Sequence, residues 1–107
     1  MTSRSEKALK ILFCEYKRRR KSGLSIDSSS EFDDGQIHAL RSFRDWSSND
    51  LTSALAEMQK SGYISINIIG DVRISSAGIA FMEEKQLDFF RDIAHLFDLE
   101  KILDLIP

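Results

Sequence analysis

The spacing of the apolar residues changes abruptly in the middle of the chain, and this change constrains the fold more than any other feature. Four apolar residues have the i, i+3, i+4, i+7 spacing of an amphipathic helix: Leu51, Ala54, Leu55 and Met58. Ser47 and Asp50 have capping-box spacing at its start, and Ser61-Gly62 is typical of its end. From Tyr63 to Ile68, isoleucines alternate with polar residues, which predicts a strand buried on one face.

The residues that follow predict that this strand belongs to a hairpin. Gly70-Asp71 suits a tight turn, and residues 72–74 return as a second strand. Ser75 or Ser76 then caps a long helical region over residues 77–106, within which Asp98 could begin a separate final helix.

A first helix is predicted over residues 5–21. Ser3 and Glu6 have capping-box spacing, and Gly23 lies where a helix commonly ends in a left-handed residue. Five apolar residues form a stripe along this helix: Ala8, Leu9, Leu12, Phe13 and Tyr16.

Between this helix and the central one, the pattern is weaker. Residues 24–26 are predicted as a short strand and residues 27–30 as a loop. Asp33 or Asp34 then caps a second helix that runs to about Arg44. Its inward residues are predicted to be Ile37, Leu40 and Phe43, and the ring of Trp46 is interpreted as core at the junction that follows.

Length and composition limit the classes of protein. The chain has 107 residues, the size of one domain, and 42% of them are hydrophobic, enough for a core. A formal net charge of −2 excludes a globally basic nucleic-acid binder. The single cysteine, Cys14, excludes an internal disulfide, and no apolar run is long enough to span a membrane. We therefore expect a cytoplasmic protein with no membrane partner.

The positive charge is concentrated at one end of the sequence. Residues 1–26 carry a net charge of +6, whereas residues 27–107 carry −8. Five consecutive cations, residues 17–21, form the densest cluster. They are interpreted as a solvated helix end, where cations favour the negative pole of the helix dipole. A phosphate-binding patch is the alternative.

The order of predicted elements is helix, short strand, helix, tight turn, helix, hairpin, helix. The stretch WSSNDLTSALAEMQKSGYI (46–64) resembles the recognition helix and first wing strand of winged-helix transcriptional regulators, and ISSAGIAFM (74–82) resembles their closing segment. The resemblance covers about residues 5–84. It implies a mainly α fold with a small antiparallel hairpin: a winged helix-turn-helix domain over residues 1–84, with a C-terminal helical extension over residues 85–107.

The resemblance also implies binding to double-stranded DNA. If the apolar stripe of the central helix faces the core, Asn49, Ser53, Ala56 and Lys60 face outward, with Thr52 and Glu57 beside them. Asn, Ser and Thr side chains can hydrogen-bond to bases, and cations contact phosphates. The predicted DNA-binding residues are Asn49, Thr52, Ser53, Lys60, Arg73, Arg41 and Arg44.

A protein-interaction module or small adaptor that binds no DNA is the alternative. The central helix sets Asp50 and Glu57 against a single cation, Lys60, so its charge does not favour phosphate. No enzyme is predicted, and no metal or cofactor, because the possible catalytic or ligating residues lack suitable neighbours. His38 and His95 are far apart, and Cys14 is interpreted as a packed or half-buried thiol. The adjacent pairs Asp33-Asp34 and Glu83-Glu84 diverge on a helix.

The C-terminal region has more apolar surface than a small domain easily covers. Its main stripe comprises Ile79, Met82, Phe89, Ile93, Leu96 and Leu103, widened by Leu87, Phe90 and Phe97. We expect a symmetric homodimer through this region, as in many winged-helix regulators. The alternative is that the region folds back over the chain's own sheet and first helix.

Overall fold

Three short strands form one antiparallel sheet from distant parts of the chain. The computed structural model describes residues 1–94, with side chains to residue 88. The strands are β1 (Glu31–Phe32), β2 (Ile64–Ile66) and β3 (Val72–Ile74). The order in the sheet is β1-β3-β2, with Glu31 opposite Arg73 and Ile64 opposite Ile74. The predicted hairpin is confirmed as β2 and β3, and β1 is an addition to it.

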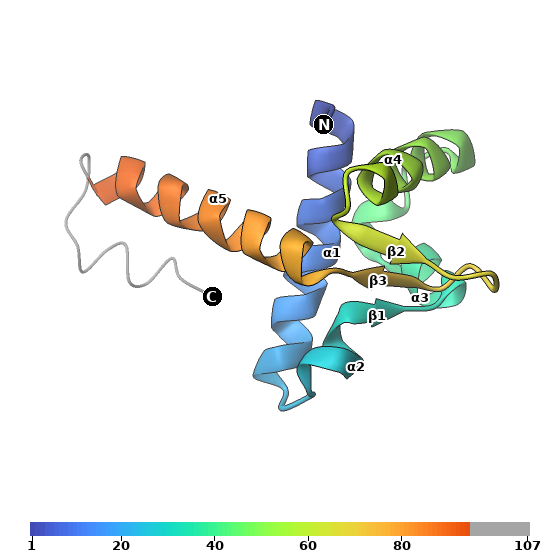
Figure 1. Ribbon diagram of the computed structural model, residues 1–107, viewed down its shortest axis with the longest axis horizontal. Helices are drawn as coiled ribbons and strands as arrows, with labels where there is room; N and C mark the ends of the chain where they lie inside the picture. The colour runs from blue at the N-terminus through green and yellow to red at the C-terminus, as the bar shows by residue number, and fades with distance from the viewer. Residues whose placement is uncertain (95–107) are drawn as a thin grey trace.

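The described chain is mainly helical, as predicted. Its helices are α1 (Ser3–Lys21), α2 (Ile26–Ser30), α3 (Asp34–Ala39), the 3-10 helix η1 (Arg41–Phe43), α4 (Ser48–Lys60) and α5 (Ser76–Ala94). Helix α1 is central and contacts α2, α4 and α5. The sheet, α3 and α4 lie to one side of α1, and α5 extends away on the other (Figure 1).

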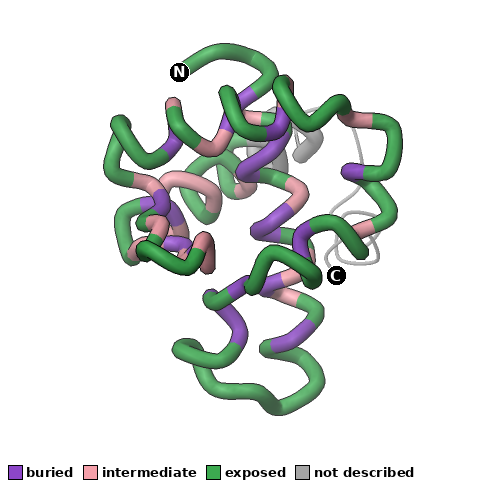
Figure 2. The backbone as a smooth tube through the Cα atoms, turned by 90° about the vertical axis from the view of Figure 1, so that its right-hand side faces the viewer, coloured by how far each residue is buried: buried purple, intermediate pink, exposed green. Residues whose placement is uncertain are grey.

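The core lies between α1, α4 and the sheet. The predicted stripe of α1 is confirmed, because all five of its apolar residues are buried. Leu51, Ala54 and Met58 of α4 are buried as predicted, and Leu55 is half-buried. Phe32 and Val72 supply the sheet's part of the core. On α1 and α4, buried residues alternate with exposed ones along the helix, as expected where one side faces the core (Figure 2).

Helix α1 begins one residue earlier than the capping-box spacing predicts. Thr2, not Ser3, is the cap, and its hydroxyl accepts the N–H of Ser5 at 3.2 Å. Thr2 Oγ1 also donates to the buried hydroxyl of Ser5 at 3.1 Å. The prediction failed because Thr2 has the same capping chemistry one position upstream. At the other end, Gly23 has the expected left-handed conformation, with φ of +96°.

Residues 24–30 are where the sequence prediction is most clearly wrong. Residues 24–26 form no strand, and residues 27–30 are not a loop, because helix α2 begins at Ile26. Ser25 caps α2 by accepting the N–H of Ser28 at 3.1 Å. Ser30 is buried, and its hydroxyl donates to the carbonyl of Ile26. The Ser25 cap favours a helical turn in this polar run, because it satisfies one of the otherwise unpaired N–H groups of the first turn.

The second predicted helix is also shorter than expected. Of the two caps that the sequence allows, Asp33 is the one used, in a capping box with Gln36, but the α-helix ends at Ala39. Leu40 has extended backbone geometry, with ψ of 123°, and the chain then continues as η1. Of the residues predicted to face inward, Ile37 and Phe43 are buried and Leu40 is half-buried.

The tip of the hairpin departs from the predicted alternation. Strand β2 ends at Ile66, and the side chain of Asn67 accepts the N–H groups of Ile69 and Asp71 at 3.0 and 2.9 Å. Gly70 closes the turn with φ of +94°. The alternating pattern predicts an inward-facing Ile68, but this side chain is fully exposed at the tip, and that of Ile69 is 82% exposed. The Asn67 turn interrupts the strand before Ile68.

A single serine joins the hairpin to the start of α5. The Ser75 N–H donates to the carbonyl of Tyr63 at 3.0 Å, and its hydroxyl donates to the carbonyl of Gly62 at 2.7 Å. The same hydroxyl accepts the N–H of Gly78 at 3.0 Å. Of the two caps that the sequence allows, Ser75 is therefore the one used.

Candidate nucleic-acid interface

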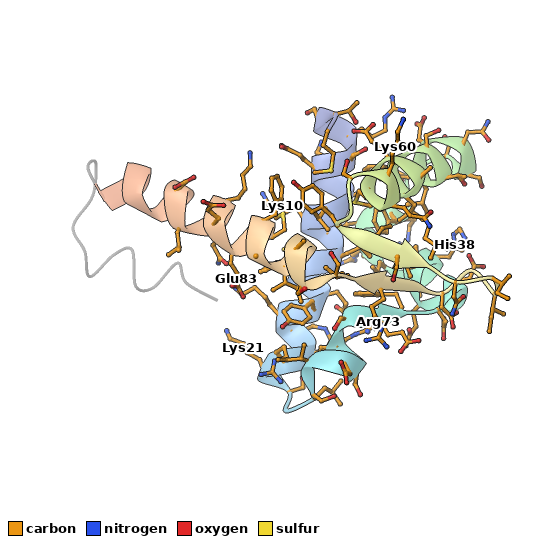
Figure 3. All side chains as sticks on the ribbon, viewed as in Figure 1. Lys10, Lys21, His38, Lys60, Arg73 and Glu83 are labelled. Atoms are coloured by element: carbon orange, nitrogen blue, oxygen red, sulfur yellow. The ribbon has the colours of Figure 1, made fainter. Side chains whose placement is uncertain are left out.

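Helix α4 presents a polar outer surface. Ser47 caps the helix by accepting the Asp50 N–H at 3.1 Å, which confirms the predicted cap. Because the apolar side of α4 is buried in the core, the opposite side faces solvent. All four predicted DNA-binding residues of this helix are exposed: Asn49, Thr52, Ser53 and Lys60. Figure 3 marks Lys60 on α4, near the N-terminal end of α1.

The acidic residues beside this surface are engaged by the N-terminus of α1. Arg4 forms an ion pair with Asp50, with Nη1 and Oδ1 at 3.1 Å. The backbone N–H of Thr2 donates to the Glu57 carboxylate, and this hydrogen bond lowers the pKa of Glu57. The two acidic groups that weigh against phosphate binding thus have partners within the fold. This role of Arg4 was not predicted, because it depends on a contact between residues 46 positions apart.

Two shallow recesses are lined jointly by the N-terminal end of α1 and by α4. One, of about 340 Å³, is lined by Ser3, Arg4, Lys7, Asp45, Trp46 and Asp50. The other, of about 430 Å³, is lined by Thr2, Ser3, Arg4, Ser5, Ser53, Ala54 and Glu57. Arg4 and Lys7 therefore place two cations beside the predicted surface of α4. Trp46 is half-buried and packs edge-on against Phe43 at 5.4 Å between centroids, which favours its interpretation as core.

Arg73 lies in a different environment from the other predicted residues. Its guanidinium pairs with Glu31 at 2.8 Å and with Asp27 at 3.6 Å. Glu31 is the cross-strand neighbour of Arg73, so the sheet register brings the two together. Arg73 is thus held by carboxylates of α2 and β1 rather than grouped with α4. The other two predicted arginines, Arg41 and Arg44, are exposed on and after η1, just before α4.

The cluster over residues 17–21 lies at the far end of α1 from the contacts with α4. Since α1 has 19 residues, its ends are about 27 Å apart. Lys21 and Lys60 accordingly lie far apart along the direction of α1 (Figure 3). Within the cluster, Lys17 donates to Gln86 at 3.0 Å, and Arg18 forms an ion pair with Glu15 at 2.5 Å.

Arg19 is the buried member of this cluster. It donates to Glu15 at 3.2 Å and to the carbonyl of Glu31 at 2.7 Å, and its guanidinium lies 4.3 Å from the centre of the Phe32 ring. Hydrogen bonds from Arg18 and Arg19 lower the pKa of Glu15, the one from Arg18 having the larger effect. The interpretation of the cluster as a solvated helix end is therefore wrong for Arg19, which is buried and bonded to β1.

The residues considered for catalysis are dispersed. His38 lies 3.3 Å from Asp34 on the exposed side of α3, and Asp33 serves as a helix cap. Cys14 is exposed, so its interpretation as a packed or half-buried thiol is wrong. Within residues 1–94 no group of three His, Cys, Asp or Glu side chains is arranged to hold a metal ion. His95 lies outside the described residues.

Among the described helices, none combines the length and the apolar character needed to cross a membrane. Comparisons of the chain with protein-family models, with curated proteins and with solved structures found no match.

Proposed function

We propose that this chain is a winged-helix protein that binds duplex DNA as a homodimer and regulates transcription. The order of its elements supports this: α1, α3 and α4 precede a two-stranded hairpin, with the short helices α2 and η1 between them, and the sheet has the order β1-β3-β2. In this interpretation α4 is the recognition helix and the β2–β3 hairpin is the wing. The resemblance of residues 46–64 and 74–82 points the same way.

The observation that carries the proposal is the polar, exposed side of α4. A helix of this kind fits a major groove about 12 Å wide. Asn49 would pair with an adenine edge, while Thr52 and Ser53 would contact bases or phosphate. Lys60, Arg41 and Arg44 would contact the backbone. The ion pair of Arg4 with Asp50 reduces the repulsion that this carboxylate would otherwise exert on phosphates, whereas Glu57, bonded to a neutral backbone N–H, keeps its negative charge.

Retention on random duplex DNA at low salt tests the proposal. We expect binding that falls steeply with salt concentration, because phosphate contacts release counterions. Lys60→Glu should weaken retention roughly tenfold and reduce the salt slope by about one, for every sequence tested. Lys21→Glu makes the same change of charge at the far end of α1 and should have little effect. A flat salt response, or equal losses from both variants, would argue against α4 as the DNA contact.

A protein-interaction module or small adaptor is the second candidate. It is favoured by the wing itself, because Arg73 is paired with Glu31 and Asp27. The wing tip is apolar, with Ile68 and Ile69 exposed. Such a wing suits a protein partner better than a phosphate backbone. If the chain folds but shows no retention on duplex DNA at low salt, this candidate replaces the first.

We propose that the C-terminal region forms the interface of the homodimer. Ile79 and Met82 pack against the core, but Leu87, further along α5, is 58% exposed, and α5 extends well beyond α1 (Figure 1). The side chains of the remaining stripe residues lie outside the described part. Sedimentation at micromolar concentration should give twice the chain mass of 12.2 kDa. A single species of 12.2 kDa would refute the dimer.

A further inference from the structure

The turn between α1 and α2 exposes apolar and cationic side chains together. Leu24 and Ile26 have exposed fractions of 45% and 53%, although both are large aliphatic residues. Gly23 adopts φ of +96° and reverses the chain between the two helices. Arg20 and Lys21, at the end of α1, are also exposed. We call Arg20, Lys21, Leu24 and Ile26 the turn patch. It lies on an exposed, projecting extremity of the molecule (Figures 1 and 2).

The carboxylates around the turn patch already have partners. Glu15 is paired with Arg18 and Arg19, while Asp27 and Glu31 are both paired with Arg73. Arg20 donates to the backbone carbonyl of Leu24 at 2.9 Å, a neutral acceptor that leaves its charge uncompensated. The patch therefore combines positive charge with exposed aliphatic surface.

We propose that the turn patch is a peripheral contact site for an anionic phospholipid surface. Cations beside exposed aliphatic side chains suit such a surface, because the headgroups carry negative charge and the acyl boundary accepts apolar groups. Duplex DNA matches the charge but offers little surface to Leu24 and Ile26. A projecting turn can also reach a flat surface without moving any helix.

This proposal is independent of DNA binding by α4. The prediction of no membrane partner was based on the absence of a membrane-spanning segment. A surface contact requires none, so that absence does not bear on the turn patch. The cytoplasmic leaflet is anionic, which agrees with the expected location of the protein. The patch and the outer surface of α4 lie near opposite ends of α1, so each surface is accessible when the other is occupied.

Flotation with phosphatidylcholine vesicles, with and without phosphatidylserine, tests the proposal. We expect the full chain to bind only the phosphatidylserine vesicles, and to bind them less as salt is raised. Since each basic residue near such a surface contributes about fivefold to binding, Arg20→Gln with Lys21→Gln should weaken binding about 25-fold. Leu24→Ser with Ile26→Ser should also weaken it, and because these side chains are exposed, the variant should keep its fold.

The chain offers a matched control for each double variant. Ile68→Ser with Ile69→Ser removes two exposed isoleucines at the wing tip, and Arg41→Gln with Arg44→Gln removes two exposed cations near α4. Neither control should affect flotation. The proposal fails if the chain does not bind phosphatidylserine vesicles, or if controls and patch variants lose binding equally. It also fails if a short duplex DNA displaces the vesicles and the patch variants lose DNA binding, because the patch would then be a nucleic-acid site.

Discussion

Replacing Gly78 with alanine is expected to lower the free energy of unfolding by about 3 kcal/mol and the melting temperature by roughly 10–20 °C. A Cβ atom at this position would lie 2.3 Å from the carbonyl oxygen of Tyr63 and 3.0 Å from Cγ2 of Ile74. Gly78 lies in the first turn of α5, where alanine is preferred by up to about 1 kcal/mol on helix propensity alone. The steric conflict exceeds this preference, so the net change is destabilising.

The conflict is hard to relieve because the atom that the added Cβ would meet, the carbonyl oxygen of Tyr63, is held in place by hydrogen bonds of the backbone. The carbonyl of Tyr63 accepts the Ser75 N–H, and the Ser75 hydroxyl ties the carbonyl of Gly62 to the N–H of Gly78. Moving α5 away would break these bonds. Gly35→Ala in α3 is the control, because its Cβ would meet only a side-chain atom, Asp33 Oδ1, at 3.3 Å. Thermal and urea unfolding of both variants measure the effect. A Gly78→Ala variant with the melting temperature and unfolding free energy of the original chain would contradict the prediction.

Features that depend on neighbours in sequence could be predicted. The stripe of α4 and its Ser47 cap follow from spacings of seven residues or fewer, and the hairpin follows from the pattern within residues 63–74. The left-handed Gly23 follows from its place just after a helix. Local spacing also identified the exposed side of α4, because a helix with one buried side must turn the other outward.

Features that depend on contacts between distant residues could not be predicted. The ion pair of Arg4 with Asp50 requires the N-terminus of α1 to lie beside α4. The pairing of Arg73 with Glu31 requires a two-residue strand that has no periodicity of its own. The exposure of Ile68 results from a competing local signal, because the side chain of Asn67 forms a turn where the alternating pattern predicts strand.

Arg19 illustrates this limit, and its substitution is expected to cause the second large loss of stability. In sequence it is one of five consecutive cations, yet its side chain is only 10% exposed, compared with 67% for Arg18. Arg19→Met is expected to cost about 3 kcal/mol of unfolding free energy, because it leaves the Glu31 carbonyl without this donor and deprives Glu15 of its buried partner. Urea unfolding should show a lower midpoint with an unchanged slope.

Arg18→Met is the control that distinguishes the effect of losing buried contacts from the effect of losing one positive charge. Arg18 and Arg19 both pair with Glu15, so each variant removes one cation from the same carboxylate. Because Arg18 is exposed, its pair is screened by water and its loss should cost only a small fraction of the effect at Arg19. Arg19→Lys should fall between the two, since an ammonium group cannot reproduce both the planar hydrogen bonds and the contact with Phe32. Equal losses at positions 18 and 19 would mean that net charge at the helix end, rather than the junction of α1 with α2 and β1, determines the stability of this region.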